Sequence, residues 1–158
     1  MKKLIIFPTV AVLMALTLLT AGCKKSDSTS ETWAFKGTNY ASSSCATGTG
    51  ASNGTLSVVS SSPVGSMQVF FYNGLPTISG TDTVVAWGTA VTESEVSISL
   101  GAGASTYYST GGNGRQIIMV TVSGGKVSVS TMANSPVELL NVASLSTDSA
   151  GATFSITQ

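Results

Sequence analysis

The hydrophobic pattern divides the chain into an apolar start and a long alternating remainder. Lys2 and Lys3 precede an apolar run over residues 4–19, and small residues then lead to Cys23. About 16 apolar residues at ~1.5 Å rise span roughly 24 Å, less than a ~30 Å hydrocarbon core. A positive start, a short apolar segment and small residues at its end predict a secretory signal rather than a transmembrane helix.

From Trp33 onward, short runs of β-branched and aromatic residues alternate with Ser, Thr and Gly. Such runs between turn residues are typical of strands. The predicted strands cover 33–35, 55–59, 67–72, 83–87, 96–100, 107–108, 117–122, 127–130, 137–142 and 153–157. This pattern favours an all-β fold, a single antiparallel β-sandwich (Ig-like or jelly-roll-like) of about 8–10 short strands. The run 67–72 is apolar and aromatic, so we expect a central strand buried on both faces.

One hairpin can be predicted in register. Gly124-Gly125 suits a two-residue turn with positive φ, which pairs Val122 with Val127 and Val120 with Val129. Four valines then share one face, while Thr121 and Ser128 lie on the other. A slip by one residue would destroy this separation, so the register is well determined.

The glycine-rich segment 111–114 suggests a second hairpin, between residues 105–110 and 115–122. In that pairing Tyr107 lies inside, beside Ile118. Tyr108 then lies outside beside Ile117, and we expect an exposed apolar patch of Tyr108, Ile117 and Met119.

Composition limits the range of partners. After removal of residues 1–22, a flexible tether (23–31) and one β-sandwich domain (32–158) are expected. This mature part has five Lys and Arg against seven Asp and Glu, a net charge of −2. Its basic residues are scattered, whereas a nucleic-acid binder needs them clustered, so nucleic acid is excluded as a partner.

The residues around the end of the apolar run carry a resemblance. Ala21-Gly22-Cys23 resembles the lipobox of bacterial lipoproteins, although Thr20 and not Leu19 stands three places before the cysteine. The resemblance implies cleavage between Gly22 and Cys23, lipidation of Cys23 and a membrane as partner, since acyl chains anchor through buried methylenes. A signal peptide without lipid is the alternative. Lipid on Cys23 leaves Cys45 without a partner in the chain, and we expect a small buried hydrophobe there, with an intermolecular disulfide or a reactive thiol as the alternatives.

The tether start, Cys23-Lys24-Lys25-Ser26-Asp27, is also similar to small lipoproteins of Bacteroidetes. This resemblance implies a place, the outer membrane with the domain on the periplasmic face or cell surface. Asp27-Ser28-Thr29, Asp82-Thr83-Val84 and Asp148-Ser149-Ala150 each resemble the Asp-[Ser/Thr]-aliphatic acceptor of O-glycosylation in Bacteroidetes envelope proteins. The candidate acceptors are Ser28, Thr83 and Ser149.

The chain has no histidine. A Ser-His-Asp or Cys-His nucleophile system is therefore excluded, as are zinc sites built on histidine. We expect no metal and no cofactor. Glu93 and Glu95 would share one face of an extended strand and are the best carboxylate pair for a hydrolase, but the favoured explanation is solvated charges at a strand start that guard an edge against aggregation. The other acids, Asp82, Glu138 and Asp148, stand singly.

Three functions fit these observations. The first is a non-enzymatic cell-envelope lipoprotein, a structural or protein-interaction module whose partner is an envelope protein or glycan. The second is a ligand-binding sandwich, above all for carbohydrate, with Trp33, Trp87 and Tyr108 as candidate contacts because sugar rings stack on aromatic faces. The third is a hydrolase using carboxylates. A face displaying two or more of Trp33, Trp87, Tyr72 and Tyr108 would favour the second.

Overall fold

The computed structural model describes residues 31–50, 53–112, 116–141, 143 and 148–158. These residues form an all-β fold without an α-helix. The strands are β1 (Thr32–Phe35), β2 (Thr38–Ala41), β3 (Ser44–Gly50), β4 (Asn53–Ser61), β5 (Val64–Tyr72), β6 (Gly80–Val84), β7 (Glu95–Ala102), β8 (Ser105–Ser109), β9 (Ile117–Ser123), β10 (Lys126–Thr131), β11 (Val137–Asn141) and β12 (Ser149–Thr157). No helix among the described residues has the length and apolar character that a membrane crossing requires.

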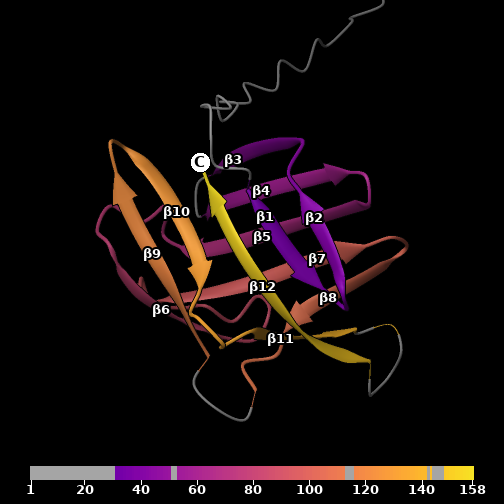
Figure 1. The fold of residues 1–158 in the computed structure, drawn as a ribbon. Helices are drawn as coiled ribbons and strands as arrows, with labels where there is room; N and C mark the ends of the chain where they lie inside the picture. The colour runs from indigo at the N-terminus through magenta and orange to yellow at the C-terminus, as the bar shows by residue number, and fades with distance from the viewer. Residues whose placement is uncertain (1–30, 51–52, 113–115, 142, 144–147) are drawn as a thin grey trace, which may run out of the picture.

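All twelve strands belong to one mostly antiparallel sheet, in the order β2-β1-β12-β10-β9-β6-β7-β5-β4-β3. Strands β11 and β8 lie off this path and connect β12 to β7 by a second route. The parallel pair among these strands is β6 with β7. Figure 1 shows that the sheet folds over itself, so that β2, β1, β12, β10 and β9 cross in front of β3, β4, β5, β7 and β8.

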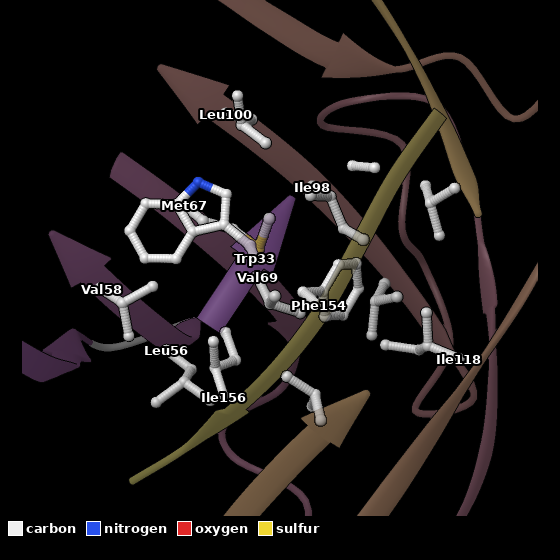
Figure 2. Close-up of a cluster of buried hydrophobic side chains, with 14 of the residues drawn as sticks. Trp33, Leu56, Val58, Met67, Val69, Ile98, Leu100, Ile118, Phe154 and Ile156 are labelled. Carbon is white, nitrogen blue, oxygen red and sulfur yellow. The ribbon is translucent and has the colours of Figure 1, made fainter. Parts of the chain in front are cut away.

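The core fills the space between these two layers. Alternate residues of the rear strands, such as Val69 and Ile98, meet Trp33, Phe154 and Ile156 of the front strands (Figure 2). This arrangement follows from period-2 alternation, because every second side chain of each strand points to the same interior.

The predicted hairpin at Gly124-Gly125 is confirmed. Val122 pairs with Val127 and Val120 pairs with Val129. Both glycines have positive φ, 59° and 76°, which is the geometry of a tight two-residue turn. The expected valine face is also found, since Val120, Val127 and Val129 are buried and Val122 packs against the core.

The second predicted hairpin is wrong. Strand β8 pairs with β7 and β11, whereas β9 pairs with β6 and β10. Tyr107 and Ile118 are both buried as expected, but on strands that do not pair. The glycine-rich segment therefore leads from one part of the sheet to another, and local turn chemistry does not reveal these non-local pairings.

Two further differences concern strand number and burial. The sequence predicts about 8–10 strands, and the structure adds β2 and β3, whose Ser, Thr and Gly content hides them. The strand predicted over 67–72 corresponds to β5, which lies between β4 and β7. It is not buried on both faces, because Gln68 and Phe70 are half-exposed and Tyr72 is exposed on the side away from the core.

Candidate functional site

The outer side of β7 is shaped by small residues. Val96, Ile98 and Leu100 face the core, so Ser97 and Ser99 face outward, yet both serines are buried. The segment that follows β6 covers this region, because the backbone N–H of Trp87 donates to the carbonyl of Ser109 and that of Gly88 donates to Ser97 Oγ. Positive φ at Gly88 (75°) helps to turn the segment back over the sheet.

This arrangement brings three aromatic rings together on the outer face. The ring centroid of Trp87 lies 4.7 Å from that of Phe70, edge to face, and 5.1 Å from that of Tyr108. All three side chains are half-exposed. Both distances lie in the range of favourable aromatic pairs. We call Phe70, Trp87 and Tyr108 the aromatic platform.

Polar and aromatic groups extend the platform along β5. Gln68 precedes Phe70 on the same side of the strand and accepts a hydrogen bond of 3.4 Å from Ser99 Oγ. Tyr72 follows Phe70 on that side and is 41% exposed. Beyond Tyr72 lies a pocket of about 190 Å³, lined by Tyr72, Asn73 and Glu93 together with residues 71 and 74–78. The outer face thus combines rings, amides and a carboxylate.

The sequence-predicted contact residues divide in two. Trp87 and Tyr108 are brought together, as a ligand site requires. Trp33 is 2% exposed and stacks on Tyr40 at 5.1 Å, so it belongs to the core and is not available as a contact. Sequence reasoning missed Phe70, whose signal is its place between Gln68 and Tyr72 on the outward parity of β5.

The expected patch of Tyr108, Ile117 and Met119 does not form. It depended on the incorrect β8–β9 hairpin. Tyr108 pairs with Ser99 and Leu140, whereas Ile117 and Met119 of β9 pair with Thr83 and Thr81 of β6. Met119 is 45% exposed, but it lies on β9, which does not pair with β8, the strand of Tyr108.

A polar cluster closes one end of the sandwich. Lys36, at the β1–β2 turn, forms an ion pair with Asp148 and donates a hydrogen bond of 3.0 Å to Tyr107 Oη, which itself donates to Asp148 at 2.9 Å. The bond to Asp148, with that to Tyr107, raises the pKa of Lys36, and the bonds from Lys36 and Tyr107 lower the pKa of Asp148. Both groups are held in their charged forms, which suits a structural clip and opposes use of the lysine as a nucleophile.

The candidate carboxylate pair has a structural use. Glu95 Oε2 accepts hydrogen bonds from the backbone N–H groups of Val91 and Thr92, at 2.9 and 3.2 Å. Glu93 is exposed and lies at the pocket beside Tyr72. Glu138 accepts a hydrogen bond from Ser149 Oγ. Each of these acids therefore has a separate environment, and Glu95 is committed to holding the turn before β7.

Asp82 is the buried acid of the described residues. It is 8% exposed, and its register partner is Ile118, so its side chain lies on the core-facing side of the sheet. Burial raises the pKa of Asp82 above its ordinary value, because a low-dielectric surrounding disfavours the charged form. No other acid of the described residues lies with it in a group able to bind a metal.

A second and larger hollow lies over β1, β2 and β12. This groove of about 540 Å³ is lined by small outward residues, among them Thr32, Ala34 and Ser155, and by Trp33, Tyr40 and Phe154, whose side chains are buried. It offers no charged side chain and no exposed ring. Its volume exceeds that of the pocket beside Tyr72, but the exposed ring and the carboxylate lie at that pocket.

Cys45 is buried, as predicted for a small hydrophobe, and its Sγ lies 3.4 Å from the carbonyl oxygen of Thr157. The expectation that it lacks a partner is wrong, because Cys45 is disulfide-bonded. Gly22, Cys23 and Ser28 lie outside the described residues. Of the other candidate acceptors, Ser149 is exposed, whereas Thr83 is half-buried in β6 between β9 and β7.

Among the residues that the structure describes, no three His, Cys, Asp or Glu side chains gather as metal ligands do. Comparisons with protein-family models, curated proteins and solved structures found no match to this chain.

Proposed function

We propose that the protein is a non-enzymatic lipoprotein of the bacterial cell envelope, held at the outer membrane by lipid on Cys23, whose β domain is an interaction module. The proposed localisation is supported by the first 25 residues. Lys2 and Lys3, the apolar run and Ala21-Gly22-Cys23 stand there in the order that a lipoprotein signal peptide has. Dual or triple acylation would hold the chain firmly at a bilayer.

The observation that carries the binding role is the aromatic platform. Large aromatic side chains normally enter the core of a β domain, as Trp33 and Phe154 do here. Trp87 instead contacts both Phe70 and Tyr108 on the outer face, and all three stay half-exposed. Exposed apolar groups gathered in one place mark interaction or ligand-binding sites. Carbohydrate binding, the second candidate function, is favoured by the same rings.

The disulfide of Cys45 bears on the proposed lipidation, because it requires a second cysteine. The sequence contains one other cysteine, Cys23, so within a single chain only that residue can pair with Cys45. One sulfur atom cannot carry a thioether and a disulfide together. Lipidation and pairing are therefore alternative fates of Cys23, and both belong to an exported chain, since disulfides persist in oxidising compartments.

Fractionation of cells that express the full chain tests the proposal. We expect the native protein and Cys45→Ser in the membrane fraction, and Cys23→Ser largely in the soluble fraction. Mass spectrometry of the mature amino terminus should find Cys23 acylated, with Gly22 removed. Membrane retention of Cys23→Ser, or an unmodified peptide that runs through Cys23, would contradict the anchor. Recovery of all Cys23 in a disulfide with Cys45, with none acylated, would do the same.

A further inference from the structure

We propose that the outer face of β5, β7 and β8 is a binding site for a neutral oligosaccharide, with the aromatic platform as its stacking surface. The inference deepens the interaction role proposed above and rests on it for its biological setting only. Four features of the face support it: the rings, their polar neighbours, the charge and the exposed area.

The rings are ordered and accessible together. Trp87 touches both Phe70 and Tyr108, with centroid distances of 4.7 and 5.1 Å. Tyr72 continues the apolar line, because alternate residues of one strand lie roughly 6.6–6.8 Å apart on the same face. The C–H faces of a sugar ring pack on such surfaces, and rings that are already fixed lose little conformational entropy on binding.

Polar groups accompany these rings, and most of them are uncharged. Gln68 and Ser99 are bonded to each other at 3.4 Å, and by strand register Ser99 lies between Gln68 and Tyr108. The Gln68 amide and the Tyr108 hydroxyl both donate and accept, which matches the hydroxyl groups of a sugar, whereas the buried Ser99 only bonds to the amide. Asn73 and Glu93 at the pocket of about 190 Å³ add an amide and a carboxylate at the Tyr72 end.

The charge of the face argues for a neutral ligand. Among the described residues, the basic side chains are Lys36, which is paired with Asp148, and Lys126, which follows the β9–β10 turn. Neither lies on β5, β7 or β8. Sulfated or phosphorylated ligands need cationic partners, and Glu93 would repel them.

The area of the rings argues against a second protein as the occupant. Phe70, Trp87 and Tyr108 are mostly buried and Tyr72 is 41% exposed, so these side chains, of about 150–250 Å² each, expose at most a few hundred Å² together. A stable protein interface buries about 800 Å² on each partner. The strip is interrupted by Ser and Gln side chains and is thus long, narrow and mixed in character, which fits an extended sugar chain better than a protein surface.

Titration calorimetry on the exported full-length protein, purified with its anchor in a non-glycosidic detergent, tests the inference. The probes are cellohexaose, maltohexaose and mannohexaose, with sulfated heparin oligosaccharide as the charged comparison. We expect binding of at least one neutral hexaose and no binding of the sulfated one. Because the chain has two tryptophans and Trp33 is buried, the bound sugar should also change the fluorescence of Trp87.

Variants locate the site. Trp87→Ala and Tyr108→Ala should each weaken binding by at least about tenfold, as expected of central aromatic contacts. Met119→Ala, an exposed hydrophobic residue on β9, should leave binding unchanged. Near-ultraviolet circular dichroism and the melting temperature establish that each variant is folded. If Trp87→Ala fails this control, Tyr72→Ala, at an exposed position, provides the same test.

Three results would overturn the inference. These are no binding of any neutral hexaose, binding only of the sulfated probe, or neutral binding that Trp87→Ala, Tyr72→Ala and Tyr108→Ala leave intact. Self-association that Trp87→Ala abolishes, without sugar binding, would assign the face to a second copy of the chain. Each of these outcomes is independent of Cys23→Ser fractionation, so loss of the sugar site and loss of the anchor can be distinguished.

Discussion

At the scale of single residues, the surroundings of Asp82 and Asp148 shift the pKa of the same type of side chain in opposite directions. Burial raises the pKa of Asp82, whereas the hydrogen bonds from Lys36 and Tyr107 lower that of Asp148. An acid with a raised pKa in the folded state binds more protons there than in the unfolded chain, so its contribution to stability falls as pH rises. A lowered pKa has the reverse effect.

We therefore expect Asp82→Asn to raise the melting temperature at pH 7. The reason is that the amide carries no charge to desolvate at a position that is 8% exposed. An increase of about 2–8 °C corresponds to roughly 1 kcal/mol in a domain of this size. The advantage should disappear as pH falls through the raised pKa toward the ordinary value of 3.8, where native Asp82 is also protonated. Thermal melts between pH 3 and 8 measure this, and an advantage that grows in acid would contradict it.

Asp148→Asn is the matched comparison and should have the opposite sign. The folded-state pKa of Asp148 lies below 3.8, so its stabilisation is present above that value and is lost as pH falls through the lowered pKa. The variant should melt at a lower temperature at pH 7 and converge on the native protein in strong acid. The change should be small, because the pair with Lys36 is partly exposed and screened by solvent. Equal effects at every pH would mean that packing, and not charge, explains the loss.

At the scale of elements, the β9–β10 turn depends on backbone conformation alone. Gly124 has a φ of 59°, and a Cβ there would meet nothing within 4 Å. Gly124→Val should therefore lower the free energy of unfolding by about 1–2 kcal/mol through left-handed strain. Gly124→Asn should change it little, since Asn tolerates this region and favours such turns. Urea denaturation of both variants separates the two outcomes, and equal losses would mean that the turn is not the cause.

At Gly54 of β4, glycine is required because there is no room for a side chain. A Cβ at Gly54 would lie 2.1 Å from the backbone of Gly74 in the β5–β6 connection, whereas one at Gly80 would meet nothing within 4 Å. Because backbone cannot give way as a flexible side chain does, Gly54→Ala should cost about 3 kcal/mol. Gly80→Ala should be neutral or slightly stabilising. Denaturant midpoints of the two variants give the comparison, and a tolerated Gly54→Ala would mean that the connection moves freely.

The same elements show what a sequence can predict. The β9–β10 register followed from two glycines and alternating valines, because every determinant lies within ten residues. The partners of β8 did not, because β7 and β11 are chosen by burial across the whole molecule and not by the adjacent glycines. Strands β2 and β3 were not predicted, because their Ser, Thr and Gly residues show little hydrophobic alternation.

The candidate site was predictable to a similar degree. Trp87 and Tyr108 could be nominated because Trp and Tyr are the residues that recognise sugars, but Trp33 fitted the same criterion and is in the core. Composition cannot distinguish these positions. Contact between Trp87 and Tyr108 arises because the segment after β6 folds over Ser97 and Ser99, and that return depends on hydrogen bonds to Ser109 and Ser97.

At the scale of the whole molecule, β12 connects the two layers. It pairs with β1, β10 and β11, and its Phe154 and Ile156 lie in the shared core (Figures 1 and 2). The strand comes last in the chain but is central in the sheet, so β1, β10 and β11 cannot complete their pairing until β12 is in place. Non-local pairing of this kind makes folding cooperative and slow.

A chain that ends at Asp148 should therefore lose its cooperative unfolding transition, because three strands lose their partner and the core loses Phe154 and Ile156. A chain that begins at Thr32 should keep a single transition, since β1 begins there and residues 32–158 are expected to form one domain. Its melting temperature can fall through loss of Cys23, the sole partner that the chain offers Cys45, but the transition should stay sharp. Thermal melts followed by near- and far-ultraviolet circular dichroism make the comparison. A sharp transition in the chain that ends at Asp148 would show that β12 is dispensable, and a broad one in the chain that begins at Thr32 would place the domain boundary before β1.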